Sequence, residues 1–110
     1  MNVDSSKRTR IEIILPLKYN NGQLVEICKF LETKRELIER FGGRTGLTTT
    51  SGAWKSPSTG NIVDEFVTGF FVVAPDTNET REFLRDYKEI LKERFNQEDI
   101  MITCHLIELI

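Results

Sequence analysis

The order of strand-like and helix-like segments constrains this chain more than any other feature of its sequence. Stretches rich in β-branched and apolar residues predict strands at 10–17, 47–54, 62–74 and 100–110. Helical spacing of apolar residues predicts one helix between the first two strands and another between the last two. One antiparallel sheet with both helices on one face satisfies this order. We therefore predict an α+β, ferredoxin-like βαββαβ fold with a four-stranded antiparallel sheet.

The two helices are predicted from their apolar faces and their ends. Asp76 and Glu79 have the spacing of a capping box at the start of the second helix, and Gly42-Gly43 ends the first. We expect both cysteines to be buried free thiols. The expected core face of the first helix holds Leu24, Ile27, Cys28, Leu31, Leu37, Ile38 and Phe41, and that of the second holds Phe83, Tyr87, Leu91 and Phe95.

The other face of the sheet is predicted to be unusually apolar. In the first strand Ile11, Ile13 and Leu15 are expected to face the helices, which leaves Glu12 and Ile14 on the helix-free face. The third strand is apolar at both parities, so its orientation stays undecided. In the last strand Ile100, Ile102, Cys104 and Leu106 are assigned to the helix side, and Met101, Thr103, His105 and Ile107 to the other. We expect a second copy of the chain to cover that face, giving a homodimer.

Length and charge exclude several classes of function. A chain of 110 residues is one domain, here 1–110, with 1–9 expected to form a frayed N-terminus. The net charge is −2 and the signs alternate along the chain, so no basic stripe for DNA is present. No apolar run approaches the roughly 20 residues of a membrane span, and no signal peptide is recognised, so a cytoplasmic protein is expected. We expect no cofactor and no metal, because a single histidine cannot supply a site built on several.

The stretch at 46–66, "GLTTTSGAWKSPSTGNIVDEF", is not a phosphate-binding loop. It lacks the lysine of a Walker motif and follows the C-terminal end of a helix, where the dipole is negative. It is predicted to be the second strand, a turn and the start of the third. RNA binding is a less favoured alternative: "TGFFVVA" at 68–74 is similar to an RRM strand, but adjacent Phe70 and Phe71 must point to opposite faces.

Candidate site residues come from the helix-free face and from the second and third strands. Glu12 and His105 are candidate catalytic residues, as a general acid/base pair in a partly apolar pocket. The leading hypothesis is a non-catalytic, homo-oligomeric module that binds a small ligand or a protein partner. The alternative is a small enzyme of the isomerase or hydrolase kind that uses this pair. The candidate ligand-binding residues are Trp54, Thr68, Phe70 and Thr103.

Spaced residues in the second half of the chain resemble those of a group of small uncharacterised bacterial proteins. The pattern is Gly-Leu-Thr, then Gly-x-Trp, a glycine turn, a glutamate opening the next strand, and a helix that ends in an aromatic residue with Gln-Glu. The resemblance implies a ferredoxin-like fold and carries no known activity. The residues concerned are Gly46, Leu47, Thr48, Gly52, Trp54, Gly60, Glu65, Tyr87, Phe95, Gln97 and Glu98.

Overall fold

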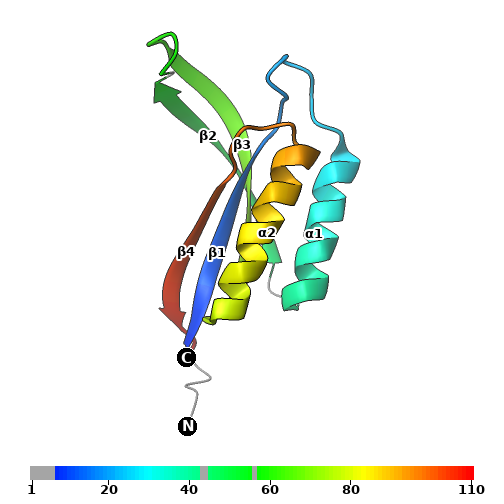
Figure 1. Ribbon diagram of the computed structural model, residues 1–110, viewed down its shortest axis with the longest axis vertical. Helices are drawn as coiled ribbons and strands as arrows, with labels where there is room; N and C mark the ends of the chain where they lie inside the picture. The colour runs from blue at the N-terminus through cyan, green and yellow to red at the C-terminus, as the bar shows by residue number, and fades with distance from the viewer. Residues whose placement is uncertain (1–6, 43–44, 56) are drawn as a thin grey trace.

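Four strands and two helices make up the part of the chain that the structure, a computed structural model, describes (Figure 1). The described backbone comprises residues 7–42, 45–55 and 57–110, and the side chains at 45, 47–54 and 63–66 lie outside the description. The elements, in chain order, are β1 (Lys7–Pro16), α1 (Ile27–Phe41), β2 (Thr45–Lys55), β3 (Ile62–Pro75), α2 (Asn78–Arg94) and β4 (Met101–Glu108). The first strand thus includes residues 7 to 9, which the sequence assigned to a frayed end.

The strands pair antiparallel in the order β2-β3-β1-β4, with β1 between β3 and β4. The helices cover only part of this sheet, and the far end of the β2–β3 hairpin projects beyond them (Figure 1). Element length explains this: the 14 residues of β3 extend about 46 Å at 3.3 Å per residue, whereas the 15 residues of α1 extend about 22 Å at 1.5 Å per residue. The four antiparallel strands and two helices are present, but the predicted ferredoxin-like fold class, in which the helices lie across the whole sheet, is corrected. The chain is an elongated α+β domain in which one end of the β2–β3 pair projects as a two-stranded ribbon beyond the helices.

The core lies between β1, β3 and the two helices. The expectation that Ile11, Ile13 and Leu15 face the helices is confirmed, because all three are completely buried. Their pairing with β3 settles the orientation that the sequence left open. Ile11 pairs with Val72 and Ile13 with Phe70, so Phe70 belongs to the helix side and Phe71 to the helix-free face. Burying each such side chain stabilises the fold by about 1.5–3 kcal/mol.

The predicted core face of α1 is wrong for most of its residues, and only Leu37 and Phe41 pack in or against the core. Leu37 is fully buried, but Leu31 is 60% exposed and so contributes little to the core. The helix is turned so that Phe30 and Thr33 face inward, with the Phe30 ring 5.3 Å from that of Phe95. Thr33 tolerates burial because its hydroxyl donates a hydrogen bond to the carbonyl of Lys29. The large hydrophobic residues that α1 and the segment before it expose are Leu24, Ile27, Leu31 and Ile38.

Two smaller expectations also need correction. Both cysteines are exposed and not buried: Cys28 lies on the outer side of α1, and Cys104 lies on the edge strand β4. The N-cap of α2 is Thr77 and not Asp76: its hydroxyl accepts a hydrogen bond from the backbone N–H three residues on, at 3.2 Å. Asp76 instead forms an ion pair with Arg81, 2.6 Å away.

Candidate functional site

The helix-free face of the sheet carries the residues with chemical potential. Arg8, Arg10, Glu12 and Ile14 alternate along β1 with its buried residues and so share this face. The register with β4 places Ile107, His105, Thr103 and Met101 opposite them in that order. On the other side, Val73 pairs with Arg10 and Phe71 with Glu12. The face therefore has charged residues on β1, apolar residues beside them on β3, and both apolar and polar residues on β4.

Arg10, Glu12 and Phe71 form one connected unit in the middle of this face. The Nε of Arg10 lies 3.1 Å from Oε1 of Glu12, and its guanidinium carbon lies 4.1 Å from the centroid of the Phe71 ring. These three residues line a cavity of about 50 Å³ together with Ile14, Gly69 and Phe70. The side chains of Arg10 and Glu12 keep 39% and 40% of their surface exposed, so the unit is open to a ligand.

A glycine on β2 allows the Phe71 ring to lie against the sheet. Gly46 pairs with Phe71, and a Cβ atom at Gly46 would stand only 1.9 Å from Cε1 of the ring. Any larger residue there would force the ring to move. Close contact between the backbone of β2 and an aromatic ring on β3 thus explains why a glycine stands at this position.

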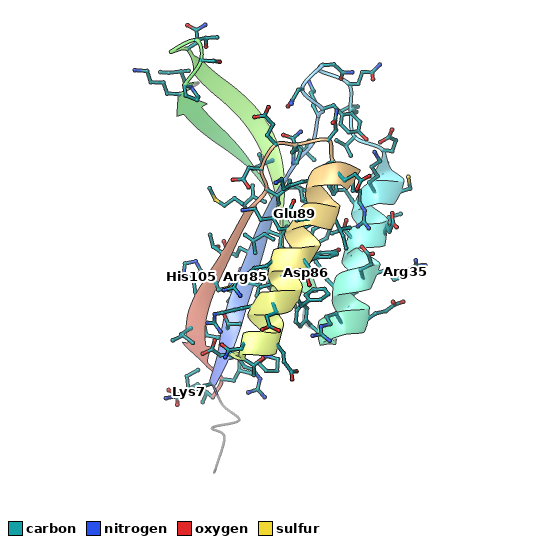
Figure 2. All side chains as sticks on the ribbon, in the orientation of Figure 1. Lys7, Arg35, Arg85, Asp86, Glu89 and His105 are labelled. Atoms are coloured by element: carbon teal, nitrogen blue, oxygen red, sulfur yellow. The ribbon has the colours of Figure 1, made fainter. Side chains whose placement is uncertain are left out.

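The structure places the two candidate catalytic residues on the same face but not opposite each other. Glu12 pairs with Thr103, and His105 pairs with Arg10, which lies two residues before Glu12 in β1. Within the part of the chain that the structure describes, the Glu12 carboxylate accepts its hydrogen bond from Arg10 and has none from His105. Figure 2 shows His105 on β4, on the opposite side of the molecule from Arg35 of α1.

The four candidate ligand-binding residues do not share a surface. Thr103 lies on the helix-free face beside Glu12. Thr68 and Phe70 are each only 2% exposed on the helix side, where Thr68 pairs with Leu15. Trp54 pairs with Val63 in the β2–β3 ribbon, and its side chain lies outside the described residues. Of the adjacent phenylalanines, only Phe71 lies on the helix-free face. The two rings therefore do not form the shared stacking platform of an RRM.

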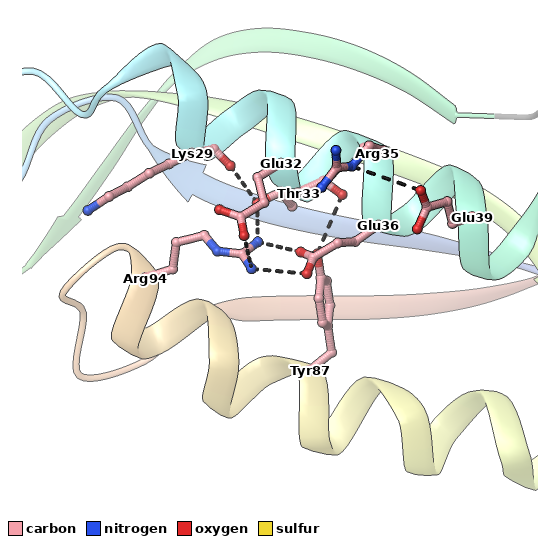
Figure 3. A network of polar contacts seen from close by, with 8 residues as sticks. All are labelled: Lys29, Glu32, Thr33, Arg35, Glu36, Glu39, Tyr87 and Arg94. Carbon is pink, nitrogen blue, oxygen red and sulfur yellow. Dashed lines mark hydrogen bonds and ion pairs between the residues drawn. The ribbon is translucent and has the colours of Figure 1, made fainter.

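A second polar cluster joins the two helices (Figure 3). The Arg94 side chain is 11% exposed, and its guanidinium donates to both carboxylate oxygens of Glu36 at 2.5 and 3.1 Å and to the Thr33 hydroxyl at 2.9 Å. The Tyr87 hydroxyl donates to the same carboxylate at 2.9 Å. Hydrogen bonds from Arg94 above all hold the pKa of Glu36 below its usual value, while burial and the neighbouring carboxylate raise the pKa of Tyr87. Each polar group is paired, so the cluster is a clamp between α1 and α2.

The exposed apolar residues of α1 form a third feature. A shallow cavity of about 350 Å³ lies over Cys28, Leu31, Glu32 and Arg35. Leu31 and the neighbouring Ile27 are 60% and 75% exposed. Among the described residues no group of three or more histidine, cysteine or acidic side chains is placed to hold a metal ion. None of the described helices is long and apolar enough to cross a membrane.

Comparison with known proteins gives a fold and no family. No protein-family model matches the chain, and no curated protein matches it. Among solved structures, a phage SAM lyase in complex with S-methyl-5'-thioadenosine matches with a TM-score of 0.70 and 13% identity, over 98% of this chain and 95% of that one. A phage SAM lyase in the apo state matches with a TM-score of 0.63 and 15% identity, over 98% and 94%.

A Bacillus cereus protein related to NIF3 also matches, with a TM-score of 0.62 and 9% identity. The match covers 97% of this chain but only 27% of that protein. At these identities the likeness establishes the fold alone. It supports a resemblance to small proteins of this architecture, but not to the group of uncharacterised bacterial proteins that the sequence pattern suggested.

Proposed function

We propose that this chain is a homo-oligomeric binding protein that holds a small nucleoside-derived ligand on the helix-free face of its sheet. The observation that carries the proposal is the cavity where Arg10, Glu12 and Phe71 converge. A ligand site needs a shaped apolar surface with a few fixed polar groups, and this unit combines an aromatic ring with an ion pair. The complex of a phage SAM lyase with S-methyl-5'-thioadenosine supports a ligand of that chemical class.

The apolar character of the same face supports the oligomer. Ile14, Phe71, Val73 and Ile107 are partly exposed there, and Met101 is 63% exposed. Several exposed apolar side chains gathered on one face are characteristic of an interface. A second copy that packs sheet against sheet would cover these residues and close the open side of the cavity.

Ligand binding is tested by titrating S-methyl-5'-thioadenosine into isotope-labelled protein and following the backbone amide shifts. The expected result is saturable shifts concentrated at Arg10, Phe71, Thr103 and His105. Shifts confined to α1, or no shifts at millimolar ligand, would overturn the proposed site. The binding measurement needs no assumption about catalysis.

The oligomer is tested separately by native mass spectrometry of two lysine variants. Met101→Lys places a charge on the helix-free face and is expected to give single chains. Ile90→Lys is the matched control, because Ile90 is 48% exposed on α2, which packs on the other face of the sheet. Single chains in the unsubstituted protein at micromolar concentration would refute the interface.

Catalysis at the same place is the second candidate, and the likeness to two SAM lyase structures favours it. Glu12 would act as the general base that takes a proton from a water molecule as its oxygen bonds to the carbon attached to the sulfonium sulfur. The carbon–sulfur bond breaks, S-methyl-5'-thioadenosine leaves as a neutral thioether, and His105 would pass the proton on to solvent. Incubation with SAM, followed by chromatographic detection of released S-methyl-5'-thioadenosine, tests this function. Glu12→Gln is expected to abolish release, and His105→Ala to reduce it. An unsubstituted protein that binds SAM and releases nothing above the uncatalysed rate would leave only the binding function.

A further inference from the structure

The guanidinium of Arg10 occupies surroundings that a free organic cation would favour. It lies over the Phe71 ring, with 4.1 Å between the guanidinium carbon and the ring centroid, and its Nε is 3.1 Å from a carboxylate oxygen of Glu12. The face of an aromatic ring is electrostatically negative and attracts cations, and a neighbouring carboxylate adds a full opposite charge. Phe71 and Glu12 therefore provide both elements of a site for a compact cation.

The ring and the carboxylate are held in place without help from Arg10. Phe71 and Glu12 are directly paired across β3 and β1, so the sheet fixes their separation. The Phe71 ring packs against Gly46, where no side chain could fit between ring and backbone. Gly69 lines the remaining space, a cavity of about 50 Å³. If the Arg10 side chain swings out, the site it leaves is already formed.

Arg10 is also easy to displace. Its side chain and that of Glu12 are each exposed by about two fifths, and an ion pair with that much solvent contact is weak. Within the part of the chain that the structure describes, its side chain makes no hydrogen bond other than the one to Glu12. Displacement breaks both this ion pair and the contact of Arg10 with the Phe71 ring, so it is expected to weaken the binding of a cationic ligand by roughly tenfold.

We infer that Phe71 and Glu12 form a cation site that Arg10 fills in the absence of ligand, so that the ligand is a compact organic cation such as a sulfonium. This inference rests on the proposed function, because it assigns a ligand class to the same face. Arg10 is then an internal competitor, and an uncharged ligand would gain nothing from its removal.

Two probes that differ in charge test the inference. SAM carries a sulfonium, and S-methyl-5'-thioadenosine is the uncharged thioether. Calorimetric titration of Arg10→Gln is expected to show SAM binding about tenfold tighter than in the unsubstituted protein, with the thioether affinity unchanged. Arg8→Gln is the matched control: it removes the same charge from the same face of β1, two residues away. The Arg8→Gln substitution is expected to change the affinity for SAM by less than about threefold.

Substitution of the ring provides an independent check. Phe71→Leu should weaken SAM binding at least fivefold in the Arg10→Gln background, and Phe71→Tyr, which keeps the ring, should not. The inference is overturned if Arg10→Gln raises the affinity for both probes equally or for neither. It is also overturned if Arg8→Gln raises the affinity for SAM as much as Arg10→Gln does. If the thioether still binds in those cases, the proposed function survives. If no variant binds either probe, both the inference and the proposed function fail.

Discussion

Replacing Arg94 by methionine should destabilise the protein far more than the same change at Arg35. Methionine keeps most of the aliphatic stem and removes the guanidinium. The Arg94 side chain is only 11% exposed, and its guanidinium makes the contacts to Glu36 and Thr33 that join α2 to α1 (Figure 3). Arg35 forms a pair with Glu39 at 3.9 Å, with both side chains more than 70% exposed. The two substitutions therefore differ in burial and not in chemistry.

The magnitude follows from what remains after the substitution. Breaking a fully buried ion pair costs about 3–5 kcal/mol, because the remaining charge has no partner. The Glu36 side chain is 33% exposed and still accepts from Tyr87, so partial hydration lowers the cost to about 2–3 kcal/mol. The entropy of unfolding is about 2.1 cal/mol/K per residue, so a chain of 110 residues should lose about 10 °C in Tm. The Arg35 variant should change by less than about 0.5 kcal/mol.

Thermal and urea unfolding followed by circular dichroism, at one fixed protein concentration, measure both variants. The fixed concentration matters because dissociation of an oligomer would shift Tm on its own. If the Arg94 and Arg35 variants both lose little free energy of unfolding, and by similar amounts, the clamp is refuted. An Arg94 loss near 2–3 kcal/mol with an unchanged denaturant slope would support it.

Three further outcomes are expected. Because Arg94 holds the pKa of Glu36 below its ordinary value of 4.5, this pair contributes stability that is complete above about pH 4.5 and is lost as the pH falls through the lowered pKa. The free energy of unfolding, measured with urea, should therefore fall less between pH 5 and pH 3 in the Arg94→Met variant than in the unsubstituted protein. Gly46→Ala should cost about 1–3 kcal/mol and displace the Phe71 ring, and the cost should nearly vanish in a Phe71→Ala background. Thr77→Ala should cost about 1 kcal/mol in urea unfolding, since it removes the N-cap of α2, and Thr77→Asp should restore most of the loss.

The parts of the fold that could be predicted are those specified by a pattern of apolar residues within a single strand or helix. The alternation in β1 places Ile11, Ile13 and Leu15 on the helix side because a central strand has one strongly apolar face. The face of α1 could not be predicted in this way. Its apolar residues form more than one stripe, and contact between Phe30 and Phe95, 65 positions apart, selects the stripe that is buried. Local periodicity holds no information about that contact.

The candidate site could be predicted only in part for a related reason. Glu12 and Thr103 were found by counting along single strands, and both lie on the helix-free face. The role of Arg10 was missed because it depends on Phe71, which is distant in sequence and close only through the pairing of β1 with β3. Charge patterning showed no basic stripe and gave no reason to single out one arginine.

The register of β3 decides both the core and the chemistry of the open face. Phe70 and Phe71 are adjacent, so a shift of one residue would exchange them and move the other ring into the core. The pairs of Ile11 with Val72 and Ile13 with Phe70 fix the choice, because they bring apolar side chains together under the helices. That same choice leaves Phe71 beside Glu12 and below Arg10 on the open side. The cation site thus depends on the burial of residues on the other face of the sheet.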